Sequence, residues 1–179
     1  MSGPSDERRA LPDLPEDARI WIFGADRLLS GSEASRLSDS VGRFLEGWAA
    51  HGQELAAGHE WLHDRFLVIA VDERRAPPSG CSIDALVRHL RQLEREFGVE
   101  LVDGSAVWFR SDGEIRRVGR EKFRQLAAEG TVDGDSVVFD LTVQRLGELR
   151  AGRWELPARA SWHARLLGGR GDRGLTPPA

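Results

Sequence analysis

Cys81 is the only cysteine among the 179 residues, and the residues around it could position a reactive thiol. It lies where a predicted strand and loop give way to a predicted helix. The free N–H groups and the dipole of a helix N-terminus favour a thiolate, the form of cysteine that attacks an electrophile. The sequence therefore makes Cys81 a candidate nucleophile. The candidate binding residues on either side of it are Ser79, Gly80, Ser82 and Asp84.

A structural role for Cys81 is the alternative. Asp84 follows three residues later, and a carboxylate in the same turn would use the free N–H groups and repel a thiolate. Free cysteine is also among the most buried residue types. Cys81 could therefore be a small residue packed at the helix entry, with Ser79 or Ser82 as the cap. The residue pattern slightly favours this structural role.

A cysteine nucleophile needs a base, and the chain has five histidines. His89 falls two helical turns beyond Cys81, too far along the helix axis for a contact. His163 lies in a segment expected to fold back on the core, and Asp72 and Glu73 follow the strand that precedes Cys81. If the chain is an enzyme, we predict a catalytic group made of Cys81, His163, Asp72 and Glu73.

Several other kinds of site are excluded by the residues present. His59 and His63 are separated by an even number of residues along a predicted strand and would therefore point to the same face of the sheet. No third metal ligand accompanies them, so we expect no metal and no cofactor. The only lysine, Lys122, lies in a predicted helix and not in a Gly-Lys-Ser/Thr loop, which excludes a P-loop ATPase. No Gly-x-Ser-x-Gly elbow is present, and no Gly-x-Gly-x-x-Gly motif follows a predicted strand.

The composition is that of a globular protein folded in water, with 40% hydrophobic and 30% charged residues. No run approaches the roughly 18 apolar residues that a membrane helix needs, and the first residues lack the apolar segment of a secretory signal. We therefore expect a cytoplasmic protein. Its charge is uneven: residues 141–179 carry seven Arg against three acidic residues, net +4, and the preceding residues carry 18 basic against 26 acidic, net −8.

The hydrophobic pattern predicts an α+β fold. Ser30 and Glu33 form a capping box at the start of one expected helix, and a second helix is expected over 83–97 with Gly98 at its end. Strands are expected at 19–23, 55–62, 66–71 and 107–109, the first and third being the most apolar. The order strand-helix-strand-strand-helix-strand is that of the ferredoxin-like split βαβ arrangement, in which the first and third strands are central.

An α/β C-terminal extension is expected to pack on this core. It contains a predicted helix at 120–129, a strand at 137–139, and then Trp154 and Trp162, which are costly to leave in water. The predicted organisation has four parts: a flexible lead-in at 1–17, the ferredoxin-like core at 18–118, the extension at 119–167 and a flexible tail at 168–179.

Short motifs along most of residues 18–167 carry a resemblance to a known family. They are Arg19-Ile20-Trp21-Ile22-Phe23, Trp48 with His51-Gly52, Arg65-Phe66, Val71-Asp72-Glu73, the Ser79–Asp84 stretch, Val138-Phe139 and Ser161-Trp162-His163. On these motifs the chain resembles a family of small, functionally uncharacterised bacterial proteins often labelled "ABC transporter ATPase". The label does not fit a chain that lacks a phosphate-binding loop, and the resemblance implies no catalytic residues.

Three functions follow from these patterns, in decreasing order. The first is a cytoplasmic binding or interaction module of unknown specificity and unknown partner, for which a protein or a second copy of the chain is a candidate and a membrane is not. The second is a thiol-dependent enzyme, a hydrolase, transferase or redox protein, that uses Cys81. The third is nucleic-acid binding through an open sheet face with Trp108 and the Arg-rich tail, which ranks last because a basic tail beside an acidic body is commonly a solvated surface.

Overall fold

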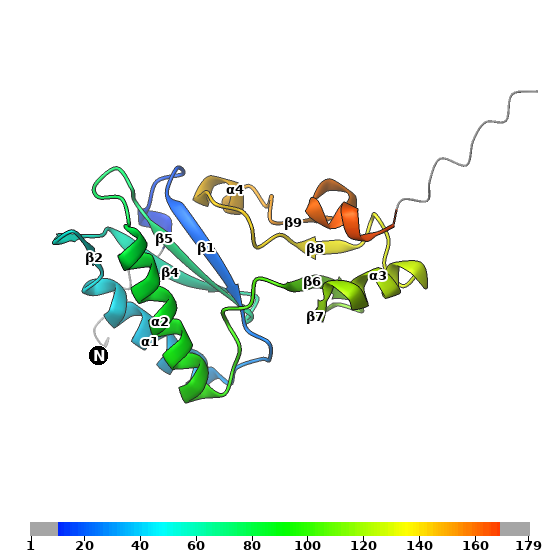
Figure 1. Cartoon of the computed structure of the whole chain (residues 1–179), viewed down its shortest axis with the longest axis horizontal. Coiled ribbons are helices and arrows are strands. Elements are labelled where there is room, and N and C mark those ends of the chain that lie inside the picture. Colours follow the sequence, from blue (N-terminus) through cyan, green and yellow to red (C-terminus); the bar gives the residue numbers. More distant parts are fainter. Residues whose placement is uncertain (1–10, 169–179) are drawn as a thin grey trace, which may run out of the picture. The chain divides into compact units, whose positions relative to one another are not determined.

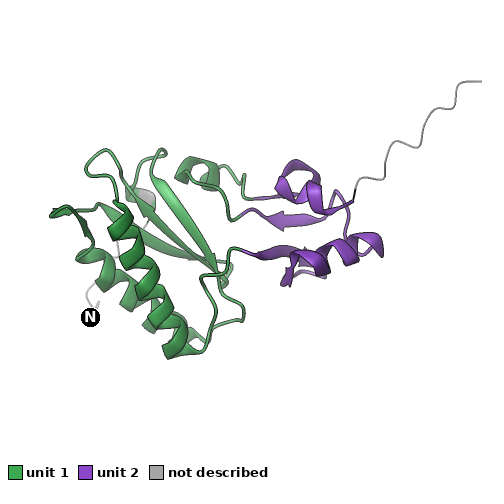
Figure 2. Ribbon diagram, viewed as in Figure 1, with its two compact units in different colours: residues 1–104, 141–154 green, residues 105–140, 155–179 purple. Residues whose placement is uncertain are grey.

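The computed structural model describes residues 11–168 (Figure 1). The chain forms two compact units, one of residues 1–104 and 141–154 and the other of residues 105–140 and 155–179 (Figure 2). Residues 1–10 and 169–179, which hold most of the predicted lead-in and tail, lie outside the described residues. A 3-10 helix at Leu11–Asp13 with a buried Leu11 shows that regular structure begins before the expected start at residue 18.

The main sheet of unit 1 has three antiparallel strands in the order β1-β5-β4. All six residues of β5 are apolar and buried, as a strand covered on both faces requires, and this strand is central. Ile22 of β1 lies opposite Val68, and Trp61 of β4 lies opposite Leu67. The strands are β1 (Arg19–Gly24), β4 (Ala57–Leu62) and β5 (Phe66–Val71), and the short β2 (Ala49–Ala50) and β3 (Gln53–Glu54) pair with each other.

Helices α1 (Gly31–Glu46) and α2 (Gly80–Phe97) cover one face of this sheet (Figure 1). α2 ends at Gly98, whose φ of 57° is a left-handed conformation that glycine adopts without steric penalty. Each helix begins with a capping box, Ser30 with Glu33 and Ser79 with Ser82. The helices and alternate residues of the sheet share one core, which includes Leu37, Val41, Leu45, Leu67, Ile69, Val71, Leu86, Leu90 and Leu93.

The opposite face of the sheet is covered by a segment from later in the chain. Helix α4 (Leu146–Arg150) lies on this face (Figure 1), and the Trp154 side chain lines the same pocket as α4. The Trp154 ring meets the ring of Phe66 edge-on, with the centroids 5.2 Å apart and the planes at 90°. The prediction that Trp154 would return to the core is confirmed, since its side chain is buried.

Unit 2 is built on a four-stranded antiparallel sheet in the order β7-β6-β8-β9. Asp112 and Gly113, with φ of 54° and 78°, form the turn between β6 and β7. The elements are β6 (Ala106–Ser111), β7 (Glu114–Gly119), α3 (Arg120–Ala128), β8 (Val137–Phe139), β9 (Glu155–Pro157) and 3-10 helices at Ala158–Ala160 and Trp162–Leu166. Its core includes Val107, Phe109, Phe123, Val132, Val138, Ala158 and Leu166.

The predicted place of the fourth strand is wrong. Residues 107–109 belong to β6, which pairs with β7 and β8 and not with β1. The free edge of β1 is met instead by a single antiparallel bridge between Arg19 and Arg145. Two backbone hydrogen bonds flank that bridge, from Ile20 to Gln144 and from Leu146 to Ala18, each 3.0 Å long. The α+β class is confirmed, with this difference in pairing.

The predicted division at residue 118 also differs from the structure. Strand β6 lies before that boundary and β8 after it, yet the two strands pair within one sheet. Residues 141–154, expected in the extension, belong to unit 1. Backbone pairing between segments that are distant in the sequence therefore decides the units.

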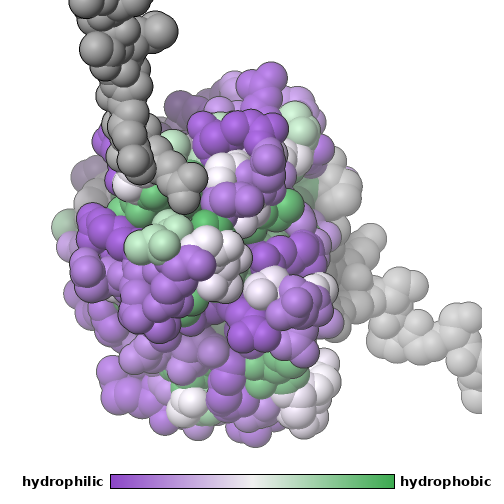
Figure 3. Space-filling model, turned by 90° about the vertical axis from the view of Figure 1, so that its right-hand side faces the viewer, coloured by the Kyte–Doolittle hydropathy of each residue, from purple (hydrophilic) through white to green (hydrophobic). Residues whose placement is uncertain are grey.

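On the face drawn in Figure 3 the described residues are mainly hydrophilic, and the hydrophobic ones form small separate groups.

Candidate functional site

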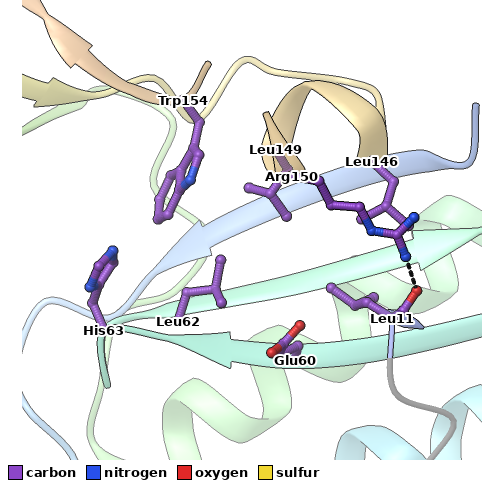
Figure 4. A pocket seen from close by; sticks show the side chains of 8 residues that line it. All are labelled: Leu11, Glu60, Leu62, His63, Leu146, Leu149, Arg150 and Trp154. Carbon is purple, nitrogen blue, oxygen red and sulfur yellow. Dashed lines mark hydrogen bonds between the residues drawn. The ribbon is translucent and has the colours of Figure 1, made fainter. Parts of the chain in front are cut away.

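A cavity of about 310 Å³ lies on the face of the unit 1 sheet opposite α1 and α2 (Figure 4). Its walls come from the end of β4, from α4 and from the segments around them. The apolar lining residues are Leu11, Leu62, Leu146, Leu149 and Trp154, and the polar ones are Glu60, His63 and Arg150. An apolar cavity with a few polar groups is the usual form of a small-molecule site.

The turn between β4 and β5 fixes one wall of this pocket. His63 and Asp64 have φ of 53° and 52°, as both central residues of a type I′ hairpin turn must, and Arg65 N–H donates to the Leu62 carbonyl at 3.1 Å. The turn places the His63 ring 5.7 Å from the ring of Trp154, at an interplanar angle of 32°. Two aromatic rings from distant parts of the chain therefore border the cavity.

Arg150 forms the opposite wall with its charge already paired. Its Nη2 donates to the Leu11 carbonyl at 2.6 Å, as Figure 4 shows, and its Nη1 donates to the carboxylate of Glu16. These two bonds hold the guanidinium in place and neutralise it. Arg150 therefore joins the N-terminal 3-10 helix to α4 and closes that end of the cavity.

Glu60 brings an unmatched negative charge to the rim. It projects from β4 on the same face as Leu62, and its carboxylate lies between Leu62 and Leu11 in Figure 4. Its side chain is exposed, and it takes part in no hydrogen bond or ion pair within residues 11–168. An apolar cavity bordered by aromatic rings and a free carboxylate can accommodate an apolar body that carries a positive charge.

The sequence does not predict this pocket. Its walls come from three stretches, around Leu11, around Leu62 and from Leu146 to Trp154, and no periodicity relates them. The one usable signal was Trp154, whose apolar surface required a buried position. The side chains that meet Trp154 could not be derived from that requirement alone.

The predicted site around Cys81 is exposed and lies at the start of α2. The Cys81 side chain is exposed and has no hydrogen-bond partner in the described part of the chain. Ser82 N–H donates to Ser79 Oγ at 3.1 Å, and Ser79 N–H donates to Ser82 Oγ at 2.7 Å, so both serines serve the helix start. Gly80 is the first helical residue and is exposed. The binding role of these residues stays a prediction.

The expectation that Asp84 lies in the first helical turn, where it would repel a thiolate at Cys81, is wrong. The first turn of α2 contains no acidic residue, since the helix begins at Gly80 and Asp84 falls in its second turn. Ser79 and Ser82, not a carboxylate, satisfy the N-terminal N–H groups. The expectation that Cys81 is packed at the helix entry is also wrong, because its side chain is exposed, whereas the expected cap at Ser79 is confirmed.

Asp72 and Glu73 are paired with arginines. Arg74 donates to both carboxylate oxygens of Asp72 at 2.9 and 3.0 Å, and these bonds hold the pKa of Asp72 below its ordinary value. Glu73 accepts from Arg145 at 3.1 Å and lies 3.6 Å from a guanidinium nitrogen of Arg19. Both carboxylates therefore stabilise the end of β5, and none of these contacts involves Cys81.

His163 is enclosed in unit 2. It is 1% exposed, its Nδ1 lies 2.7 Å from Ser161 Oγ, and its ring stacks on Trp162 with the centroids 3.9 Å apart. Burial lowers the pKa of His163 to about 4, so the ring is neutral near pH 7. Cys81 belongs to unit 1 and His163 to unit 2, and their grouping stays a prediction.

The expectation that His59 and His63 point to the same face of the sheet is wrong. His59 contacts Ser38 of α1 on the helical side of the sheet. His63 lies in the turn beyond β4, where its left-handed backbone directs the ring toward Trp154 on the other side.

The nucleic-acid hypothesis needs Trp108 as an exposed surface on which bases stack, but the Trp108 side chain is buried.

Iodoacetamide is expected to alkylate Cys81 in the folded protein at about pH 7.5, because the thiol is exposed. Intact-protein mass spectrometry should show one added carbamidomethyl group, with circular dichroism unchanged, and none on a Cys81→Ser variant. A folded protein that resists labelling while the urea-unfolded chain reacts would contradict the exposure of this thiol and the thiol-dependent alternative with it.

None of the helices within residues 11–168 is both long and apolar enough to cross a membrane. What the pocket can bind follows from its own geometry: apolar walls, two aromatic rings and one carboxylate that is unpaired among the described residues. The resemblance to a bacterial family, drawn from short motifs, stays a prediction. No family model, no curated protein and no solved structure matches this chain.

Proposed function

We propose that unit 1 is a binding module whose pocket takes a small ligand with an apolar body and a positively charged group. The observation that carries this proposal is the apolar cavity with the unpaired carboxylate of Glu60 at its rim. Apolar walls favour burial of the ligand body, and a cation gains both from the carboxylate and from the face of an aromatic ring. Arg150 is already neutralised, which reduces its repulsion of a cation. The cytoplasm remains the proposed location.

The strand order of unit 1 supports the proposal of a ferredoxin-like core in which another segment takes the place of the fourth strand. The order β1-β5-β4, with α1 after β1 and α2 after β5, is that of the first three strands of a split βαβ arrangement. The segment around Arg145, antiparallel to β1, stands in the place of the fourth strand. In this proposal the segment that completes the sheet edge continues into α4 and so supplies a wall of the pocket.

Glu60→Gln is expected to weaken binding of an aryl-alkyl amine, tryptamine, by up to about fivefold, since an ion pair with an exposed carboxylate contributes about 0.2–1 kcal/mol. Binding is measured by titration of the indole N–H resonances in ¹H–¹⁵N NMR spectra. Indole-3-propionate, with the same ring and the opposite charge, should bind the original protein more weakly, and Glu60→Gln should remove that difference.

Glu54→Gln is the matched control, because Glu54 is an exposed carboxylate on β3 outside the pocket. A second variant, Leu62→Trp, fills the cavity with apolar volume at a half-buried position. It should abolish binding of both ligands while the protein stays folded. Equal affinity for the amine and the carboxylate would contradict the proposed charge, and binding unaffected by Leu62→Trp would contradict the proposed place.

A further inference from the structure

Ser38 and His59 form a hydrogen-bonded pair on the helical side of the unit 1 sheet. Ser38 Oγ lies 2.8 Å from His59 Nε2. The two side chains are 6% and 8% exposed, and they come from α1 and β4. His59 neighbours Glu60 in β4 and therefore points to the other face of the sheet, so this pair is separate from the ligand pocket.

A second cavity, of about 400 Å³, lies beside this pair. Ser38 is one of its lining residues, and the apolar walls are Leu28, Leu29, Ala34 and Trp61. Leu28, at 63% exposure, is the one large hydrophobic side chain that stands out in solvent among residues 11–168. An exposed leucine beside a concave apolar wall is what a surface that meets an apolar ligand presents.

Trp61 adds a polar group without a partner to the same wall. Its indole Nε1 is buried and has no hydrogen-bond acceptor within the described residues. Buried donors are nearly always paired, so an unpaired one in a cavity wall calls for an acceptor from outside the chain. The residues around this cavity thus include apolar side chains, a serine bonded to an imidazole and an indole donor without a partner among the described residues, and these are the groups that an acyl compound needs for attack and for stabilisation of its oxygen.

We propose that Ser38 is a nucleophile and His59 its base, and that the second cavity accepts the acyl group of a small apolar ester. With the ring proton on Nδ1, His59 Nε2 takes the proton of Ser38 as Oγ bonds to the ester carbonyl carbon. The carbonyl–alkoxy bond then breaks, and the departing alcohol receives that proton. Water repeats the two steps on the acyl-serine, so the overall reaction is hydrolysis of an ester to an acid and an alcohol.

The chain contains a matched comparison for this pair. Ser40, two residues later in α1, lies 3.4 Å from His89 Nε2, and His89 stacks on Phe44 with the centroids 4.7 Å apart. Ser40 is not among the residues that line the second cavity, whereas Ser35 lines it but has no hydrogen bond to a histidine. Replacement of Ser40, which lies outside the cavity, therefore separates the effect of the dyad from a general effect on α1.

The test is reaction of the full-length protein with a fluorophosphonate probe, which bonds only to an activated serine, followed by peptide mass spectrometry. The expected result is one adduct, on Ser38, that is lost in Ser38→Ala, forms at least tenfold more slowly in His59→Gln, and is unchanged in Ser40→Ala. The original protein should also release p-nitrophenol from p-nitrophenyl butyrate, and Ser38→Ala should not.

Absence of an adduct on Ser38, or equal rates with and without His59, would overturn the proposal. Circular dichroism checks that each variant is folded. If His59→Gln does not fold, the labelling of the three serines is compared within the original protein. Labelling of Ser38 well above that of Ser35 and Ser40 supports the dyad, and equal labelling refutes it. None of these readouts depends on the amine-binding pocket.

Discussion

Replacement of Trp154 by alanine is expected to lower the free energy of unfolding of unit 1 by about 3–5 kcal/mol. The indole is 5% exposed, packs edge-on against Phe66 at 5.2 Å and borders the pocket beside His63. The substitution removes this apolar burial and the aromatic contacts together, and the surrounding strands can close the space only in part. Urea denaturation followed by far-UV circular dichroism measures the loss.

Trp154→Phe serves as the control, because a phenyl ring keeps part of the contact with Phe66 and should cost clearly less. The alanine variant should also lose affinity for tryptamine, since one wall of the pocket is gone. A loss of stability below about 1 kcal/mol, the range of exposed positions, would show that residues 141–154 are not packed on the sheet as described.

Unit 2 is expected to lose about 3 kcal/mol of stability between pH 7 and pH 4 through His163 alone. Burial lowers the pKa of this imidazole to about 4 in the folded protein, against an ordinary value of 6.5. Between these two values the unfolded chain binds a proton that the folded chain does not, so acid favours unfolding. Each pH unit in that window costs about 1.4 kcal/mol, and the effect levels off below pH 4.

The measurement is urea unfolding at pH 7.5, 5.5 and 4, monitored through ¹H–¹⁵N resonances of unit 2. His163→Gln should show a shallower decline than the original protein, whatever its stability at neutral pH, because the titrating group is removed. His51→Gln, at an exposed turn, should retain the full decline. The same pH dependence in the original protein and in His163→Gln would contradict the neutral buried state of the ring.

Local chemistry accounts for the elements that the sequence predicted. Ser30 with Glu33 starts α1, and Gly98 ends α2 in a left-handed conformation. The continuous apolar run of β5 becomes the central buried strand. Each of these signals acts over a few residues, through a hydrogen bond or a backbone preference, and therefore needs no tertiary partner.

The sequence by itself thus determined an α+β chain, the ends of its helices, its central strand and the position of Cys81 at a helix start. Tertiary structure decided that the segment around Arg145, and not residues 107–109, meets β1, and it brought Leu11, Glu60 and Trp154 to one pocket and Ser38 to His59. The physical reason is that hydrophobic periodicity specifies which face of an element is buried, whereas its partner is selected by packing among segments far apart in the chain.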